Sequence, residues 1–271
     1  DFCLWKKSKK DEPSWPDPWF DGGRPGWHIE DTAISEKYLG QQYDIHGGAR
    51  DLIFPHHEAE IAQMESASGK KPLVRYWLHT GFLNVKGQKM AKSIGNFITI
   101  KDALKKYDGK VLRMFYISGH YRSPIDFSEE LLEQAKHSLQ RLNDFIRKLR
   151  DSNEKDNIKL IEKTKKEFFK RMDDDFDTPK ALAVIFDFVK EVNKNGGGKK
   201  SYKLMLEFDK IFNVLETEEE KIPIAIKELI DEREKARKEK DYDKADNIRK
   251  QIKEKGYVLE DSEESTVIKK K

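Results

Sequence analysis

The stretch FPHHEAEIAQMESASG, residues 54–69, places two histidines and two glutamates directly behind a proline. Apolar residues recur through this stretch at helical spacing. Pro55 suits a first helical position, where its missing N–H costs nothing, and Gly69 is a usual helix stop. The stretch therefore predicts a helix that begins near Pro55 and ends before Gly69.

His56 and Glu60 are four residues apart on this predicted helix, so their side chains share one face. Such a face can hold a cation like zinc, which accepts imidazole and carboxylate ligands. The simpler interpretation is a pair of surface residues at a helix start, where the helix dipole favours glutamate. The stretch by itself leaves both interpretations open.

The composition bounds the possible architectures and partners. The chain has 271 residues, 37% of them hydrophobic, which suits two or three domains. Its 53 Lys and Arg residues nearly balance 50 Asp and Glu residues, and the net charge is only +3. Because the chain as a whole is not basic, any contact with RNA must be local.

The cysteine count and the hydropathy pattern bear on location. Cys3 is the single cysteine, which excludes an internal disulfide framework and fits a reducing cytoplasm. No apolar run is long enough to span a membrane, and no signal peptide is visible. We therefore expect a soluble, cytoplasmic protein with no membrane partner. The sequence begins at Asp1 inside what reads as a structured segment, and we expect it to be a partial chain.

Residues 1–125 hold all five tryptophans and most of the glycine, proline and histidine. Short apolar runs in YDIHGG, LIF and FLNV alternate with turn residues, which predicts strands and brief helices in an α/β layout. In such layouts, loops at the ends of strands present the catalytic side chains.

From 126 to 215 the pattern becomes helical. Residues 128–150 carry a broad apolar stripe that is typical of a packed bundle helix. Its members are Leu131, Leu132, Ala135, Leu139, Leu142, Phe145, Ile146 and Leu149. In DTPKALAVIFDFVKEVNKNGGG we expect Thr178 to cap a helix, Pro179 to be its first residue and the glycines at 196–198 to end it. We interpret that glycine run as a plain loop, because no strand precedes it and the Walker spacing is absent.

Residues 222–271 form a small charged module. They predict two amphipathic helices joined near Asp241, followed after Gly256 by a short strand, YVLED. The facing apolar residues are Ile226, Leu229, Ile230 and Ala236 on one helix and Ala245, Ile248 and Ile252 on the other. The predicted fold is therefore α/β followed by all-α, with domains at 1–125, 126–215 and 222–271.

Two further segments carry residue types suited to chemistry. In VKGQKMAKSIGN, residues 85–96, Lys89 and Lys92 could grip a polyphosphate as point charges, although an exposed basic turn is the usual meaning of this spacing. GRPGWHIEDTAIS and YDIHGGARDLIFPHHE gather further polar and aromatic side chains in what we expect to be short loops and strand ends. These are Trp27, His28, Glu30, Asp31, His46 and Asp51. Asp31 offers a third metal ligand, and the glycines at 47 and 48 would let a nucleotide approach the backbone.

Taken together, these segments strongly resemble the cysteinyl-tRNA synthetases, a family of class I aminoacyl-tRNA synthetases. The blocks that carry the resemblance are GRPGWHIE, DIHGGARDLIFPHHEAEIAQ, YWLHTGFLNVKGQKMAKSIGNF, SGHYRSPIDFS, DDDFDTPKALA and KDYDKADNIRKQIKEKGYVLED. They follow the family's order and spacing from Asp1 to about Asp261. The resemblance implies the second half of a Rossmann-like catalytic domain, then a helical bundle and a small C-terminal anticodon-binding module.

The family activates L-cysteine with ATP, which is bound together with magnesium, and transfers the cysteinyl group to cysteine tRNA. We expect the protein to be a monomer. KMAKS stands where the family has Lys-Met-Ser-Lys-Ser, so the resemblance makes Lys92 the catalytic, ATP-binding lysine and Lys89 its support. Ala91 replaces the middle serine, which should matter little because the charges meet the phosphates. Gly48 and Asp51 match adenosine-side contacts, with Asp51 suited to a ribose hydroxyl.

The family's zinc ion is held by two cysteines, a histidine and a glutamate, and binds the substrate thiolate. By resemblance, His56 and Glu60 are the last two ligands, and Asp31 stands where the second cysteine is expected. An aspartate oxygen can bind zinc, but it is a harder ligand. Trp27 and His46 match residues that floor the cysteine pocket.

Two features of the family pattern do not occur in this sequence. The His-Ile-Gly-His signature is absent, and Cys3 is not at the position of the family's first zinc cysteine. We therefore predict that this polypeptide alone does not form cysteinyl adenylate, although the full protein would.

In the terminal module, Arg237, Asp246 and Asp261 align with residues that read the anticodon in the family. Without the resemblance we would interpret all three as solvated charges. Two other functions stay open: a cysteine:amino-sugar ligase with similar core chemistry, and a non-catalytic fragment that binds tRNA or metal. The segment from Lys240 to Asp261 argues against the sugar ligase, which lacks a full anticodon module.

Overall fold

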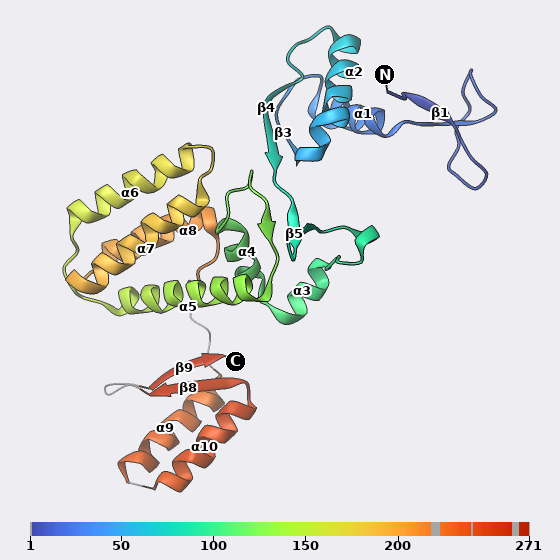
Figure 1. Cartoon of the computed structure of the whole chain (residues 1–271). Coiled ribbons are helices and arrows are strands. Elements are labelled where there is room, and N and C mark those ends of the chain that lie inside the picture. Colours follow the sequence, from blue (N-terminus) through green and yellow to red (C-terminus); the bar gives the residue numbers. More distant parts are fainter. Residues whose placement is uncertain (1, 218–222, 240, 262–265, 271) are drawn as a thin grey trace. The chain divides into compact units, whose positions relative to one another are not determined.

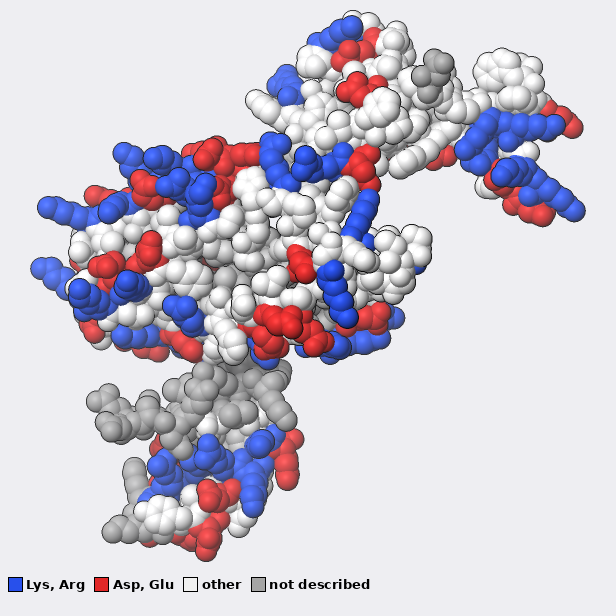
Figure 2. Space-filling view, in the orientation of Figure 1, with Lys and Arg blue, Asp and Glu red and all other residues white. Residues whose placement is uncertain are grey.

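The chain folds into two units, Asp1–Leu215 and Glu216–Lys271 (Figure 1). The structure is a computed structural model, and it describes residues 2–217, 223–239, 241–261 and 266–270. On the face that Figure 2 shows, basic and acidic side chains intermingle over the helices of the first unit. This mixture agrees with the near balance of charge in the sequence.

The first unit begins with an α/β segment built around a parallel pair of strands. Its elements are β1 (Trp5–Lys7), β2 (Gly23–Pro25), α1 (Trp27–Leu39), β3 (Tyr43–Ala49), the helical turns η1 (Arg50–Leu52) and η2 (Ile53–His57), α2 (Glu58–Ser68) and β4 (Val74–Thr80). β3 and β4 run parallel with His46 opposite Trp77, and α2 connects them. A parallel pair needs such a crossover helix, and α1 packs against α2 beside it (Figure 1).

The predicted start of the helix near Pro55 is confirmed, because Phe54 is the last non-helical residue and the helical backbone of η2 continues from Pro55 into α2. Phe54 has an extended backbone, with φ −133° and ψ 132°, and the regular helix α2 begins at Glu58. A residue that precedes proline is biased toward this extended conformation. LIF is not a strand, because Leu52 and its two successors lie in η1 and η2. Gly69 ends α2 as predicted, with φ +69°.

A three-stranded sheet and two short helices follow. The elements are β5 (Leu83–Val85), β6 (Gln88–Lys89), the turn η3 (Lys92–Ile94), α3 (Ile100–Lys106), α4 (Gly109–Ile117) and β7 (Ile125–Asp126). β5 lies in the centre, antiparallel to β6 and parallel to β7. Of the two lysines of KMAKS, Lys89 therefore ends the β5–β6 hairpin, and Lys92 begins the turn η3 that follows.

Four longer helices complete the first unit (Figure 1). They are α5 (Glu129–Asp151), α6 (Ile158–Asp173), α7 (Thr178–Asn195) and α8 (Lys199–Phe212). The apolar stripe predicted for α5 is confirmed, since every member except Leu131 is buried. The same core includes Leu112 and Phe115 of α4, whereas Met64, Leu73 and Val74 of the α/β segment form a separate buried cluster.

The predicted cap of α7 is wrong by one residue. Asp177 is the N-cap, and its carboxylate accepts a hydrogen bond from the backbone N–H of Lys180 at 3.2 Å. An aspartate carboxylate satisfies a free helical N–H at least as well as threonine does. Thr178 is then the first helical residue and Pro179 the second.

The glycine run after α7 is a helix–helix loop, as interpreted from the sequence. Gly196 ends α7 with φ +83°. The next two backbone N–H groups donate to carboxylates, Gly197 to Glu154 at 3.1 Å and Gly198 to Asp156 at 2.9 Å. These N–H groups are therefore already occupied by acidic side chains of the chain itself.

The second unit confirms the predicted helical hairpin and strand. Its elements are α9 (Ile224–Lys238), α10 (Tyr242–Glu254), β8 (Tyr257–Asp261) and β9 (Thr266–Lys270). Ile248, Ile252 and Leu259 form its buried core, with Leu229 and Ile230 packed against them. The antiparallel partner strand β9 is not evident in the sequence pattern. Among the described helices of either unit, none has the length and apolar character needed to cross a membrane.

The core of the bundle can be tested at two adjacent leucines. Leu132 is fully buried (0% exposed), whereas Leu131 is 37% exposed. Leu132→Ala should lower the free energy of unfolding by about 2–5 kcal/mol, because it leaves a cavity. Leu131→Ala should cost no more than about 1 kcal/mol. Urea denaturation followed by circular dichroism measures both, and equal losses would contradict the packing described here.

The turn between α6 and α7 depends on an ion pair. Asp175 and Phe176 both adopt left-handed backbones, with φ +55° and +54°. The Asp175 carboxylate accepts hydrogen bonds from Tyr121 Oη at 2.7 Å and from the Arg122 guanidinium. The hydrogen bond from Arg122 is the main cause that lowers the pKa of Asp175 to about 2, and Tyr121 adds to it.

A lowered carboxylate pKa stabilises the fold above the ordinary aspartate pKa, and this contribution is lost as the pH falls. For Asp175 the loss should occur between about pH 4 and the folded-state pKa of about 2. Asp175→Asn removes the titrating group, and asparagine tolerates the left-handed backbone. The variant should show a smaller decrease in unfolding free energy over this range. An identical pH profile for both proteins would show that the ion pair does not contribute.

Candidate functional site

Three neighbouring elements position the candidate metal ligands. Asp31 lies on α1, near its start, whereas His56 lies in η2 and Glu60 in the first turn of α2. The expectation that residues 27–31 form loops and strand ends is wrong, because Trp27 is the first residue of a helix. α1 packs against α2, and Asp31 of α1 lies against His56, just before α2.

Asp31, His56 and Glu60 converge as their spacing and family resemblance suggested. His56 Nε2 lies 2.8 Å from Asp31 Oδ2 and 3.0 Å from Glu60 Oε1. One ligand atom from each residue lies within 4.8 Å of the other two. His56 and Glu60 are buried, whereas the Asp31 side chain is 42% exposed. Solvent therefore reaches this group at Asp31.

Glu60 is the most deeply buried of these three candidate ligands. Its side chain is 2% exposed, and in the described part of the chain neither carboxylate oxygen accepts a hydrogen bond. Burial, and then the charge of Asp31, raise the pKa of Glu60 to about 7. A buried carboxylate that accepts no hydrogen bond is costly, and a bound cation removes that cost. The donor set and the Glu60 oxygens that lack a hydrogen bond therefore fit a divalent metal such as zinc.

The other nitrogen of His56 helps to orient its ring. His56 Nδ1 lies 2.6 Å from His28 Nδ1, so one of the two rings donates to the other. This contact leaves His56 Nε2 directed at the two carboxylates, in the manner of an outer partner of a metal ligand. Burial and the neighbouring His56 lower the pKa of His28. The indole ring of Trp27 stacks on His56 with a centroid distance of 4.2 Å.

A second group of possible ligands shares Glu60 with the first. His46, His57 and Glu60 also place one ligand atom each within 4.8 Å of the others. The sequence interpretation missed His57, although it is the second member of the HH pair. His57 Nδ1 lies 2.9 Å from His79 Nε2 of β4. Burial, followed by the neighbouring His46, lowers the pKa of His57 to about 4, which favours the neutral imidazole that binds metals.

Trp27 and His46, the two predicted pocket residues, contact different ligands: Trp27 stacks on His56, and His46 lies beside Glu60. Trp27 is 55% exposed, whereas His46 accepts or donates a hydrogen bond with Tyr43 Oη at 2.6 Å and stacks on Trp77. His46 Nε2 lies 3.6 Å from Glu60 Oε2. Trp27 is thus accessible to solvent, whereas Tyr43 and Trp77 hold the His46 ring in place.

Gly48 allows close packing at the end of β3. A Cβ added at this glycine would lie 2.7 Å from His57 Cε1 and 3.1 Å from Leu52 Cδ1. A larger residue would therefore displace the His57 ring. The predicted nucleotide contact at Gly48 stays a prediction, and the packing of His57 is a second reason for glycine here.

The lysine loop and Asp51 come together as an ion pair. Lys89 Nζ lies 2.6 Å from Asp51 Oδ2 and 4.1 Å from the centre of the Phe82 ring. The hydrogen bond from Lys89 lowers the pKa of Asp51. Lys92 Nζ lies instead over the Phe97 ring, 5.4 Å from its centre. Asn96 fixes the loop backbone between the lysines, because its side-chain oxygen accepts from Ala91 N at 2.8 Å.

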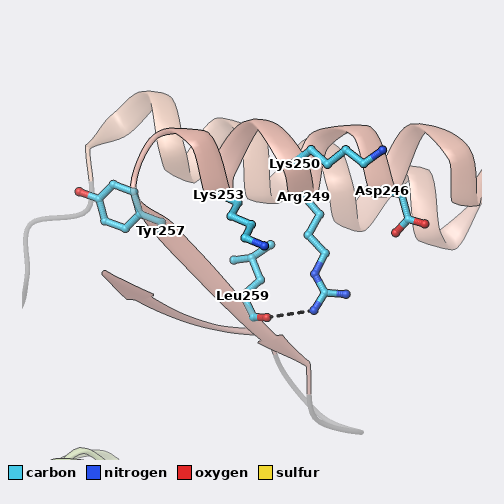
Figure 3. A pocket seen from close by; sticks show the side chains of 6 residues that line it. All are labelled: Asp246, Arg249, Lys250, Lys253, Tyr257 and Leu259. Carbon is cyan, nitrogen blue, oxygen red and sulfur yellow. Dashed lines mark hydrogen bonds between the residues drawn. The ribbon is translucent and has the colours of Figure 1, made fainter. Parts of the chain in front are cut away.

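The predicted anticodon residues lie in the second unit. Arg237 is exposed on α9, and Asp246 is exposed on α10 (Figure 3). Asp261 ends β8, but its side chain lies outside the described part of the chain. The structure therefore places two of these three side chains at the surface of one small module.

Sequence models of three protein families match the chain in order. Residues 1–137 match the model described as "tRNA synthetases class I (C) catalytic domain". Residues 167–217 match a "DALR domain", and residues 219–266 match a "Cysteinyl-tRNA ligase anticodon binding domain". The chain belongs to the cysteinyl-tRNA synthetase family. The resemblance inferred from its sequence blocks is thus confirmed.

Curated relatives of this synthetase chain carry the same family name. A "Cysteine--tRNA ligase" of Thermodesulfovibrio yellowstonii is 44% identical over 306 residues, covering 100% of this chain and 62% of the relative. Those of Methanococcus vannielii and Thermococcus gammatolerans are 45% and 42% identical, again over 100% of this chain and 62% of the relative. The chain therefore spans about three-fifths of the length of these cysteine–tRNA ligases.

Solved structures of other synthetases share the fold. A LeuRS of Agrobacterium radiobacter K84, in a ternary complex with tRNA and LeuAMS, superposes with a TM-score of 0.56 at 13% identity. It covers 72% of this chain and 31% of the LeuRS. A methionyl-tRNA synthetase of Mycobacterium tuberculosis, in complex with methionyl-adenylate, gives a TM-score of 0.51 at 17% identity, over 65% and 40% of the two chains. The class I synthetase fold that we expected is therefore present.

The metal group of this synthetase chain can be tested by zinc titration against a chromophoric chelator. Glu60→Gln should weaken zinc binding at least about tenfold, because an amide supplies no charge to the ion. Glu58→Gln is the matched control, since Glu58 is exposed on the same helix. Asp31→Cys should strengthen binding, because a thiolate is a softer ligand than a carboxylate. Equal zinc affinities of the Glu60 and Glu58 variants would exclude Glu60 as a ligand.

Proposed function

We propose that the protein carrying this chain is a cysteine–tRNA ligase, which joins L-cysteine to cysteine tRNA with ATP. The observation that carries the proposal is the convergence of Asp31, His56 and Glu60 in a chain of this family. Residues 1–125 would supply the second half of the catalytic domain, residues 126–215 the helical bundle and residues 222–271 the anticodon module. We further propose that it acts as a cytoplasmic monomer.

The amino acid is selected at the metal group. Zinc held by Asp31, His56 and Glu60 would supply an open coordination position for a thiolate. Trp27 and His46 flank this position and confine the rest of a small amino acid. Sulfur and oxygen differ little in size, so packing alone separates cysteine from serine only modestly. A soft sulfur ligand is favoured far more strongly than a hydroxyl.

The nucleotide is bound by the lysine loop and Asp51. Lys92 and Lys89 act as point charges on the phosphates of ATP, which enters with magnesium. Lys89 is paired with Asp51 in the structure, so a phosphate must compete for its ammonium group. Once Lys89 turns to the phosphates, the Asp51 carboxylate is free to accept a ribose hydroxyl. The ion pair thus holds both groups in position before ATP arrives.

The terminal module favours tRNA over an amino sugar as the acceptor. The match to an anticodon-binding domain covers residues 219–266, and Arg237 and Asp246 are both exposed there. Guanidinium and carboxylate groups can hydrogen-bond the edges of unpaired bases. Gly48 and Asp51 would take the adenosine of ATP, so the proposed ATP and anticodon contacts belong to different units.

The proposed acceptor can be tested by binding to tRNA. The chain should bind cysteine tRNA at least about tenfold more tightly than the same tRNA with a changed anticodon, as expected for one or two base contacts of about 1–3 kcal/mol each. Electrophoretic mobility shifts at fixed salt measure both affinities. Equal affinities would argue against anticodon recognition.

Charging of cysteine tRNA with radiolabelled cysteine, measured on the protein that carries this chain, tests the reaction itself. We expect charging with cysteine and none with serine. Failure to charge cysteine tRNA would overturn the proposed function.

A further inference from the structure

Two further histidines approach the buried carboxylate of Glu60, beside the metal ligands described above. We call Asp31, His56 and Glu60 the first metal group. The further histidines are His46 on β3 and His57 in η2, the turn that directly precedes α2 (Figure 1). His57 is 3% exposed, and the His46 side chain is 18% exposed. By resemblance to the family, neither histidine is a metal ligand.

Each of these imidazole rings is hydrogen-bonded through Nδ1. His46 Nδ1 lies 2.6 Å from Tyr43 Oη, and His57 Nδ1 lies 2.9 Å from His79 Nε2. His56 of the first metal group shows the same arrangement, with its Nδ1 at 2.6 Å from a neighbouring histidine. A hydrogen bond at one ring nitrogen leaves the other, Nε2, available to a cation, as is usual for histidines that bind metals.

Packing also fixes the two rings. The indole ring of Trp77 on β4 lies 4.8 Å from the His46 ring and 4.9 Å from the His57 ring, measured between centroids. Trp77 is the residue opposite His46 in the parallel strand pair. Gly48 leaves the space that the His57 ring fills, because an added Cβ would lie 2.7 Å from His57 Cε1. Both imidazoles are therefore held in place before any ion binds.

The two oxygens of Glu60 lie near different histidines. Oε1 lies 3.0 Å from His56 Nε2, whereas Oε2 lies 3.6 Å from His46 Nε2. One ligand atom from each of His46, His57 and Glu60 lies within 4.8 Å of the other two, as in the first metal group. In the described part of the chain, neither Glu60 oxygen accepts a hydrogen bond. One oxygen is thus available to each set of ligands.

Two imidazoles and one carboxylate are the donor set of a zinc site that keeps an open position. An ion in the first metal group would satisfy Glu60 Oε1 but leave Oε2 buried without a donor, which is unfavourable. An ion that binds Oε2 together with His46 and His57 removes this cost. Sites of this type hold two divalent ions about 3.5–4 Å apart.

We propose that His46, His57 and Glu60 bind a second zinc ion, with the carboxylate bridging it to the ion of the first metal group. This inference goes beyond the proposed function, which requires a single ion. Tyr43 and His79 are positioning residues, because they contact the ligating rings. Two zinc ions carry more charge than the two carboxylates offset, so the open positions favour an anionic ligand.

The test counts the zinc ions bound by the whole chain in a Cys3→Ser background, which removes the single thiol. Equilibrium dialysis at a fixed free zinc concentration, followed by mass spectrometry of the metal, gives the number per chain. We expect about two ions at saturation. H46Q/H57Q should retain one ion, because the first metal group is intact. Glu60→Gln should weaken the binding of both ions at least about tenfold, because both lose a charged ligand.

The matched control is H120Q/H137Q. His120 follows α4 and His137 lies on α5, and neither belongs to a metal group or contacts one of its rings. The control should bind as many ions as the unmodified chain. Circular dichroism of each variant verifies that the helices are still folded.

Cobalt(II) in place of zinc tests whether the two ions share Glu60. Cobalt ions that are bridged by a carboxylate couple magnetically. The electron paramagnetic resonance signal of the fully loaded chain should therefore be smaller than the sum for two isolated ions. H46Q/H57Q should give the full signal of one isolated ion. Two bound but uncoupled cobalt ions would contradict the proposed bridge.

The outcomes separate this proposal from the proposed function. One zinc ion per chain at saturation would overturn the second site, even if the protein that carries this chain charges cysteine tRNA. Equal zinc counts for H46Q/H57Q and H120Q/H137Q would also overturn it. Loss of one ion only in H46Q/H57Q would support the second site, even if charging of cysteine tRNA fails.

Discussion

The buried carboxylate of Glu60 is the constraint on which the candidate site depends. A carboxylate with 2% exposure and no hydrogen-bond partner in the described residues is stable only if it is protonated or meets a cation. His56 lies one helical turn before Glu60, and the packing of α1 against α2 brings Asp31 beside His56. The buried Glu60 carboxylate therefore lies beside two other possible metal ligands. The same two helices that form the local fold therefore create the conditions for metal binding.

Much of the helical part of the fold could be predicted because apolar residues recur at helical spacing within its elements. The apolar stripe of α5 and the facing residues of α9 and α10 are periodic. This periodicity can be recognised in each segment without knowing which other segments it packs against. Where the prediction was wrong, a local interaction determined the structure. The LIF run lies in helical turns instead of a strand, and the carboxylate of Asp177 replaced the hydroxyl of Thr178 as a cap. Neither choice leaves a clear trace in the hydrophobic pattern.

The candidate site was predictable only in part for a similar reason. His56 and Glu60 are linked by helical spacing, so the sequence alone could pair them. Asp31 could be named from the sequence only as a possible third ligand from another element, because its approach depends on how α1 packs. His57 and His79 meet across two elements separated by more than twenty residues, and no spacing rule connects them. The pairing of Lys89 with Asp51 was likewise set by the tertiary fold.

The hydrophobic core that α4 shares with the four long helices affects how segments of this family can be exchanged. The catalytic family match ends at residue 137, in the middle of α5. Leu132 and Leu139 lie on either side of that limit, and both pack in the core that also holds Phe115 of α4. A chimera joined at residue 137 would combine two halves of one helix from different parents, each shaped for its own neighbours. A crossover placed after Leu215, where the first unit ends, would leave every one of these packing interactions within a single parent.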